Sequence, residues 1–424
     1  MVLSSSLCRK CLYALPVFTA LSGWGAEPLT LAEAQRIAVG RSQLLTANEA
    51  ALSAALKMAH AAYPLPDPVL KLGVDNLPVN GADRFSLTRD FMTARRIGIM
   101  QELPSAEKRK LRAQRLSADA LKAQAERQMT LASVQRASAS AWIDRYYALA
   151  LRRLFEEQVD EAKLQVQAAE TAYRGARGSQ ADVFAARAAL SALQNRLSQL
   201  ERQERNAALM LARWVGPDAD RTPAGAPPWQ STYLEHGLTV DHLRTHPDLA
   251  VAAALVEAAQ AEARLASANR QSDWTVEASY SQRGSAFSNM ISIGVSVPLQ
   301  LDRANRQDQE LAAKLALVDE AKARYEDLLR SHEAEVRVML GDWQNGKERI
   351  ARYASELVPV AQQRAEAALA AYRGGKADLA SVLSARREAI DVRTQALTLE
   401  METARQWTQL NFLSPEHLAH QEQP

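Results

Sequence analysis

Apolar and small residues recur at helical spacing along two very long stretches of the chain. From Ser105 to Arg174 there are 70 residues without Gly or Pro, and a second such stretch, 179–215, follows the turn sequence GARG. Along it, Val183, Ala186, Leu190, Leu193, Leu197 and Leu200 recur at steps of three or four residues, which is the spacing of a seam between packed helices. At about 1.5 Å per residue the first stretch would be a rod of roughly 100 Å, too long for a globular domain. We therefore predict an antiparallel helical hairpin over 105–215 that turns at the glycines.

The same plan occurs a second time. At a constant offset of 199 residues, the segments 172–187 and 371–386 are identical at eight of sixteen positions. The opening segments PLTLAEAQRIAVGRSQLL and GLTVDHLRTHPDLAV also correspond. A second hairpin is predicted over 302–413. One duplicated unit accounts for almost the whole chain.

Three residues interrupt the outgoing helix of the second hairpin. Gly341, Gly346 and Pro359 are expected to break its regularity, and Pro359 to kink it. The predicted organisation is a first repeat at 27–216, a connector at 217–237, a second repeat at 238–413 and a disordered tail at 414–424.

Each repeat also carries two short segments in which apolar residues alternate with polar or small ones. We predict strands at about 68–79, 95–104, 274–284 and 290–301. In the first repeat, Leu70, Leu72 and Val74 share one face and Ile97 and Ile99 another. In the last strand, Ile291, Ile293, Val295, Val297 and Leu299 point one way, and Ser292, Gly294, Ser296 and Pro298 the other. Strands of about ten residues with one apolar face suit a transmembrane β-barrel, although a soluble antiparallel sheet shows the same alternation.

The number of strands predicts the assembly if these strands span a membrane. Four strands cannot close a barrel, and an open edge in lipid would leave backbone groups unpaired. Two copies would give eight strands, whose interior side chains fill, and three would give twelve, which leaves room for a conduit. The aromatic residues Phe85, Trp274, Tyr280 and Phe287 flank the strands and suit the membrane interfaces.

The N-terminus indicates export. Residues 1–26 combine two basic residues, a short apolar core and a small residue, Ala26, at the expected cleavage position, and no lipoprotein box precedes Cys8 or Cys11. Cleavage would remove both cysteines and two of the 51 basic residues, leaving 49 basic and 49 acidic residues. This balance gives no argument for nucleic acid. After residue 26 no apolar stretch is long enough for a membrane-spanning helix.

No residue pattern in the sequence indicates catalysis or metal binding more strongly than a structural role. His242 with His246, and His417 with His420, have spacings that suit a metal, but no third ligand completes either pair in sequence. No nucleophile motif or phosphate-binding loop is present. We therefore expect no enzyme activity, no cofactor and no bound metal.

The combination of a signal peptide, two repeats and the turn sequences YRGARGSQADV and YRGGKADLASV resembles the TolC-like outer-membrane efflux factor family over the whole mature chain. The segment 76–104 resembles its heavy-metal, CusC/CzcC-like branch. The resemblance implies a mainly α fold with a small β part. In that fold, duplicated helical hairpins form a periplasmic α-barrel, and four transmembrane β-strands per protomer contribute to a trimeric 12-stranded β-barrel. The connector would wrap the outside of the helical tube.

The same resemblance implies a function and partners. The chain would be a duct subunit in the outer membrane, in contact with lipid and reaching into the periplasm. It would export heavy-metal cations with an inner-membrane RND pump and a periplasmic adaptor. Multidrug efflux and type I secretion remain alternatives. A periplasmic adaptor would carry one hairpin rather than two, and a soluble coiled-coil scaffold would need neither the strands nor the signal.

The resemblance also assigns roles to the hairpin turns. The adaptor would dock at the periplasmic tip, formed by Tyr173, Arg174, Gly175, Gly178, Tyr372, Arg373, Gly374 and Gly375. Candidates for the tunnel constriction are Asp182, Asp378, Ser381 and Ser384. Ser381 and Ser384 stand where some members carry acidic residues. An alternative role for Asp378 is a helix N-cap. Arg174 and Arg373 could lock the closed tip through salt bridges to neighbouring subunits.

Overall fold

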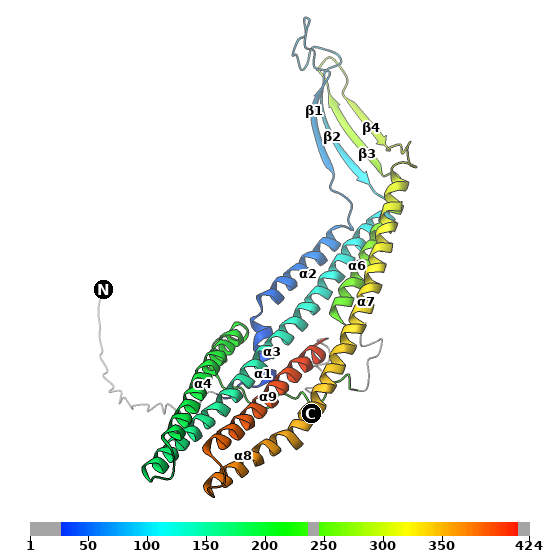
Figure 1. Cartoon of the computed structure of the whole chain (residues 1–424). Coiled ribbons are helices and arrows are strands. Elements are labelled where there is room, and N and C mark those ends of the chain that lie inside the picture. The colour runs from blue at the N-terminus through cyan, green and yellow to red at the C-terminus, as the bar shows by residue number, and fades with distance from the viewer. Residues whose placement is uncertain (1–26, 236–245, 414–424) are drawn as a thin grey trace, which may run out of the picture.

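The computed structural model describes residues 27–235 and 246–413. The molecule is elongated, with a small sheet at one end and the turns of two long helical hairpins together at the other (Figure 1). The predicted signal peptide, His242, and the tail with His417 and His420 lie outside the described residues.

Helices and strands follow the duplicated order expected from the sequence. The first repeat contains α1 (Leu31–Arg41), α2 (Gln43–Ala61), β1 (Val69–Asp75), β2 (Ala94–Leu103), α3 (Ala106–Arg174) and α4 (Gln180–Val215). After the short helix η1 (Gly216–Asp220), the second contains α6 (Pro247–Ala268), β3 (Trp274–Gln282), β4 (Met290–Ser296), α7 (Gln307–Arg352), the π-helical turn η2 (Tyr353–Leu357), α8 (Val358–Arg373) and α9 (Leu379–Asn411). The mainly α fold with a small sheet and two long hairpins is confirmed.

Three of the long helices begin at a side-chain cap. The Ser105 hydroxyl accepts a hydrogen bond from the Lys108 amide at the start of α3, and Ser179 forms a capping box with Asp182 at the start of α4. At the start of α9, Asp378 accepts a hydrogen bond from the Ser381 amide. Such caps satisfy backbone N–H groups that have no partner within the helix, so they fix where each helix begins.

The four strands form one antiparallel sheet in the order β1-β2-β3-β4. Its centre is the pairing of β2 with β3, which joins the strand hairpins of the two repeats. Leu72 lies opposite Ile97, and Ile97 lies opposite Tyr280. The apolar residues of β1 and β2 therefore share one face of the sheet, rather than lying on separate faces as the sequence analysis expected.

Two strands, β1 and β4, end several residues earlier than predicted. β1 ends at Asp75, because Asn76 takes a positive φ of 55° that turns the chain out of the extended conformation. β4 ends at Ser296, two residues before Pro298, which has no N–H to donate to the sheet.

The outgoing helix of the second hairpin differs from the prediction at its glycines. α7 runs unbroken through Gly341 and Gly346, so neither residue interrupts it. The irregularity is the turn η2, directly before Pro359. Because proline clashes with the carbonyl four residues earlier, the wider π-helical turn accommodates it. The chain changes direction between α7 and α8 (Figure 1).

The main hydrophobic core lies where helices of both repeats meet the connector. Three tryptophans hold the adjoining chain in place. The indole N–H groups of Trp142, Trp343 and Trp407 donate to the carbonyls of Leu29, Trp229 and Ser231, at 2.8 to 2.9 Å. Buried indoles with satisfied N–H groups thus fix the segment at Leu29 against α3 and the connector against α7 and α9.

Among the described residues, no helix has the length and apolar character required to cross a membrane.

Candidate functional site

The first hairpin turn, between α3 and α4, is closed by three backbone hydrogen bonds. Gly175 N–H donates to the Thr171 carbonyl, Ala176 N–H to Tyr173 and Arg177 N–H to Ala172, at 2.9 to 3.0 Å. The bond across five residues is typical of a Schellman motif, which satisfies the last carbonyls of a helix. The turn therefore ends α3 without help from side chains.

The second turn repeats this pattern at an offset of 199 residues. Gly374, Gly375 and Lys376 donate to Ala370, Tyr372 and Ala371. The left-handed residue is Gly375, with φ 68°, whereas its counterpart in the first turn is Ala176, with φ 52°. Glycine thus supplies the left-handed position only in the second turn.

Gly178 lies close to the last turn of α3. A Cβ at this position would lie 3.2 Å from the Cβ of Ala172. Gly178 therefore allows the chain to pass close to the end of α3, and its small size matters more than its backbone freedom.

The tyrosines and arginines of the two turns are not equivalent. Tyr173 is 48% exposed, whereas Tyr372 packs against the apolar cluster at the tip. Arg174 and Arg373 are exposed, and within the described chain neither forms an ion pair. Arg174 Nε donates to the Glu170 carbonyl of its own helix at 3.4 Å, and both side chains remain exposed at the tip.

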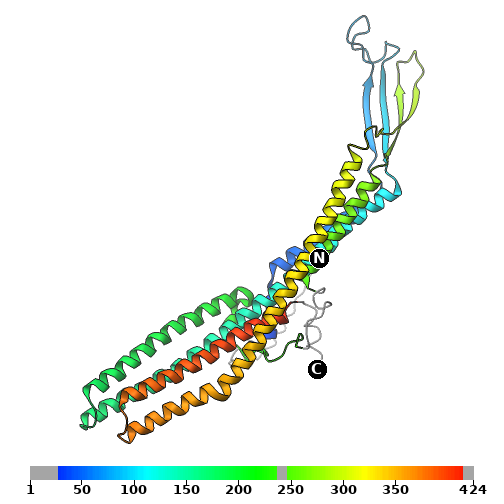
Figure 2. The ribbon, with the colours of Figure 1, turned by 45° about the vertical axis from the view of Figure 1, so that its right-hand side comes forward.

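A small apolar cluster holds the two hairpins together at the tip. Its buried members come from both hairpins and include Ala169 and Val183 from the first and Leu379 and Val382 from the second. Val183 and Val382 are related by the 199-residue offset, so the duplicated sequence places matching side chains in one shared core. Both turns also lie together at the same end of the molecule in Figure 2.

The two candidate aspartates cap helices. Asp182 accepts hydrogen bonds from the amide and hydroxyl of Ser179, at 2.9 and 2.8 Å. Asp378 accepts from the hydroxyl and amide of Ser381, and these hydrogen bonds lower the pKa of its carboxyl. Each carboxylate thus has a structural partner, as the N-cap alternative for Asp378 anticipated.

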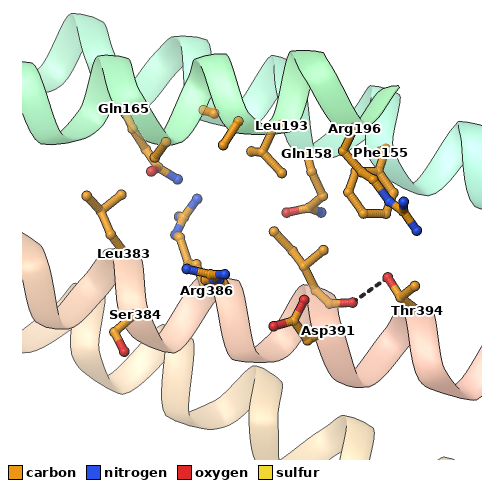
Figure 3. Close-up of a pocket in the computed structure, with 15 residues that line it drawn as sticks. Phe155, Gln158, Gln165, Leu193, Arg196, Leu383, Ser384, Arg386, Asp391 and Thr394 are labelled. Carbon is orange, nitrogen blue, oxygen red and sulfur yellow. Dashed lines mark hydrogen bonds between the residues drawn. The ribbon is translucent and has the colours of Figure 1, made fainter. Parts of the chain in front are cut away.

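A cavity of about 650 Å³ opens between the hairpins, lined by residues of α3, α4 and α9. In Figure 3, Leu193 and Gln158 face it from the first hairpin, and Arg386 extends from α9 toward Gln165. Ser384 points away from the cavity. The cavity is therefore lined by both apolar and charged groups, and Ser384 contributes little to its interior.

Arg386 joins the two hairpins. Its Nη1 lies 2.6 Å from the Glu161 carboxylate on α3. The equivalent residue Arg187 instead pairs with Glu170 inside the first hairpin, also at 2.6 Å. The second repeat has Leu369 where the first has Glu170, so Arg386 lacks that internal partner and reaches across. The sequence analysis missed this link, although the 199-residue alignment contains the signal.

At the opposite end of the molecule, the sheet has one apolar and one polar face. Ile97, Ile99, Ile291 and Ile293 lie on the apolar face, with exposures of 49 to 77%. On the polar face, Lys71 pairs with Glu277 at 2.6 Å, and Arg96 with Asp75 at 3.1 Å. Within residues 27–235 and 246–413, the side chains of the apolar face remain exposed.

The four candidate interface aromatics all lie in this region. Trp274 and Tyr280 belong to the apolar face, at the two ends of β3. Phe85 and Phe287 lie in the loops beyond the strands, and each has an arginine over its ring, with Arg84 at 4.7 Å and Arg283 at 5.6 Å from the ring centroid. These pairs combine an apolar ring with a cation, a chemistry found at membrane surfaces.

Two tandem helical hairpins are attached to a four-stranded sheet with an exposed apolar face. Residues 238–414, which make up the second repeat, match the family described as outer membrane efflux protein. No curated protein matches the chain in sequence.

Three solved structures share the fold along almost the whole chain. CusC is 15% identical, with a TM-score of 0.78 over 91% of this chain and 92% of its own. VceC from Vibrio cholerae is 19% identical, with a TM-score of 0.70 over 89% and 96%. CmeC from Campylobacter jejuni is 12% identical, with a TM-score of 0.76 over 97% and 93%. CusC and CmeC are described as channels, VceC as an outer membrane protein and the matched family as an outer membrane efflux protein, in agreement with the expectation that the chain is not an enzyme.

Proposed function

We propose that the whole chain is a member of this efflux family and one subunit of a homotrimeric outer-membrane duct. The four strands of each subunit would form a third of a 12-stranded barrel, and the helical hairpins would continue it as a tunnel into the periplasm. The observation that carries this proposal is the exposed apolar face of the sheet at the end of a helical body rich in charged residues.

The energetics of the sheet support a lipid environment. Exposed apolar surface costs about 25 cal/mol per Å² in water, so a row of half-exposed to fully exposed isoleucines and leucines is unfavourable outside a membrane. In the part of the chain that the structure describes, the outer edges of β1 and β4 have no partner strand. In lipid these edges must pair with other copies, which favours a closed oligomer over a single subunit.

The helical tips support a docking role for a periplasmic adaptor. Tyr173, Arg174 and Arg373 are exposed at the end of the molecule that lies farthest from the sheet. Together with Gly175, Gly178, Tyr372, Gly374 and Gly375 they form the surface that would meet the adaptor. An inner-membrane RND pump would supply the substrate to this end. Arg174 and Arg373 would also bridge neighbouring subunits in the closed state.

The constriction near the tip would be lined by two aspartates that cap helices and by two uncharged serines. Asp182 and Asp378 contribute carboxylates already engaged in helix caps, and Ser381 and Ser384 add no charge. We propose that selectivity for cations does not arise from an acidic ring of the second repeat. Substrate choice would lie in the pump.

The proposed substrates are heavy-metal cations, on the basis of the resemblance of residues 76–104 to the heavy-metal branch. Deletion of the gene is expected to increase sensitivity to copper, silver, zinc, cobalt or cadmium. If the deletion increased sensitivity to drugs alone, the proposal of a metal substrate would be contradicted. The proposal that the protein is an efflux duct would stand.

Fractionation tests the duct itself. The protein should be recovered in the outer membrane as a trimer that resists detergent, because its barrel would be closed by three subunits. Recovery of a soluble periplasmic monomer would contradict the proposal.

A further inference from the structure

Two histidines and an aspartate from two helices meet near the start of α6. His246 directly precedes α6, Asp248 lies in its first turn, and His332 projects from α7. The two imidazole rings are 4.2 Å apart between centroids. Asp248 Oδ2 is 3.4 Å from His246 Nδ1 and 3.7 Å from His332 Nε2. Sequence spacing pointed to His242 as the partner of His246, whereas the fold brings in a histidine from a different helix.

These distances suit a shared metal ion. One ligand atom from each of the three residues can be chosen so that all three lie within 4.8 Å of one another. In a tetrahedral zinc site with bonds of about 2.0–2.1 Å, ligand atoms are about 3.3 Å apart. The observed separations of 3.4 and 3.7 Å require only small side-chain shifts to reach that value.

The hydrogen-bonding groups around the cluster orient the ligands. His246 Nδ1 accepts a 3.3 Å hydrogen bond from the Asp248 amide, so this nitrogen carries no proton, and a metal ion would take the place of that hydrogen bond on its lone pair. On the far side of His332, Nδ1 lies 3.8 Å from the Glu335 carboxylate. A carboxylate beside Nδ1 favours a proton on that nitrogen. Nε2 then carries no proton, and its lone pair, on the side of Asp248, can bind a metal ion, as in many metal sites.

The burial of the cluster favours the neutral imidazole that a metal requires. His246 is 5% exposed, and its ring lies against that of His332. The Asp248 side chain remains 37% exposed, which leaves a path for an ion and a place for water as a further ligand.

We propose that His246, Asp248 and His332 bind a divalent transition-metal ion of the zinc class, with water completing the coordination. Two imidazoles and one carboxylate without a thiolate are the donor set expected for such an ion. The ion would fasten the first turn of α6 to α7, inside one subunit. It would be a structural ion rather than transported cargo, so this inference does not depend on the proposed export of metals.

The test is zinc stoichiometry of the full-length protein in detergent. The affinity tag is removed, resident metal is stripped with a chelator, and the protein is dialysed against micromolar Zn²⁺ before the ratio of zinc to chain is measured. One zinc per chain is expected. His332→Gln and Asp248→Asn should each weaken binding at least tenfold, and Glu335→Gln should weaken it less.

A matched control removes the same number of histidines elsewhere. The double variant His417→Gln/His420→Gln should retain one zinc per chain, and His246→Gln/His332→Gln should lose it. Cobalt(II) provides a second measurement, because its absorption spectrum reports nitrogen and oxygen ligands directly. No zinc on the wild-type protein, or zinc lost only from the His417/His420 variant, would overturn the proposal. The ratio of zinc to chain in the wild-type protein tests the site without any variant, so the test holds even if a variant folds poorly.

Discussion

At the residue scale, the two hairpin turns share their hydrogen bonds but differ at the left-handed position. Ala176 and Gly375 occupy equivalent sites with φ of 52° and 68°. A residue with a Cβ costs roughly 1–2 kcal/mol in this conformation, whereas glycine adopts it freely. The first turn is therefore the more strained of the two.

Ala176→Gly should stabilise the first turn. Relief of the left-handed strain, less the greater unfolded-state entropy of glycine, leaves a gain of up to about 1 kcal/mol. Hydrogen exchange at the Arg177 amide, which donates to Ala172, should slow by a factor of up to about five. The reverse change in the other turn, Gly375→Ala, should speed exchange at Lys376. Shifts in the same direction at both sites would contradict this explanation.

The residue scale also shows where sequence alone was insufficient. Tyr173 and Tyr372 align at the 199-residue offset, yet only Tyr372 packs into the apolar tip cluster. Likewise His246 lies beside His332, 86 positions away. Spacing along one helix predicts neighbours on that helix, but contacts between helices depend on the rotation and offset of both, which no local pattern specifies.

At the element scale, the helices were more predictable than their irregularities. The breaker-free stretches predicted α3 and α4 almost to their ends, because glycine turns and serine caps act locally. The glycines of α7 were misjudged, since a single glycine weakens a helix without ending it. The strand ends at Asp75 and Ser296 were set by Asn76 and Pro298, which the alternation of apolar residues does not register.

The two glycines of α7 should respond oppositely to the same substitution. Gly346 is buried, and a Cβ there would lie 2.4 Å from the Thr403 hydroxyl on α9, whereas a Cβ at exposed Gly341 meets nothing within 4 Å. Gly346→Ala should cost about 1–3 kcal/mol through overpacking, and Gly341→Ala should gain about 1 kcal/mol through helix propensity. Thermal loss of helical circular dichroism measures both changes.

A second substitution checks the cause of the Gly346 effect. Thr403→Ala removes the hydroxyl and methyl groups that the new Cβ would meet. In the Gly346→Ala background it should restore part of the lost stability. Equal melting temperatures for Gly341→Ala and Gly346→Ala would show that the close contact between α7 and α9 does not limit packing.

At the scale of the whole molecule, the chain combines two surfaces that require different surroundings. The helical body carries many exposed ion pairs, such as Arg364 with Glu388 at 2.6 Å, while the sheet exposes a continuous apolar face. Duplication places the two strand hairpins in one sheet and the two helical turns at one tip. The sequence predicted this arrangement of sheet and tip because the two repeats share one topology. The contacts between copies of the chain could not be predicted, because the sequence pattern describes a single subunit.

The two faces of β4 should respond differently to a charge. Ile293 and Ser292 are adjacent, both exposed, and on opposite faces of the sheet. If the apolar face meets lipid, Ile293→Lys should cost about 2–4 kcal/mol per subunit near the middle of the bilayer, and Ser292→Lys, facing a polar lumen, should cost little. The fraction of heat-modifiable trimer in isolated outer membranes measures the difference. We expect a several-fold loss for Ile293→Lys and near wild-type recovery for Ser292→Lys. Equal recovery of trimer for both variants would contradict contact between the apolar face and lipid. A loss confined to Ser292→Lys would mean that the face carrying Ser292, and not the face carrying Ile293, meets lipid.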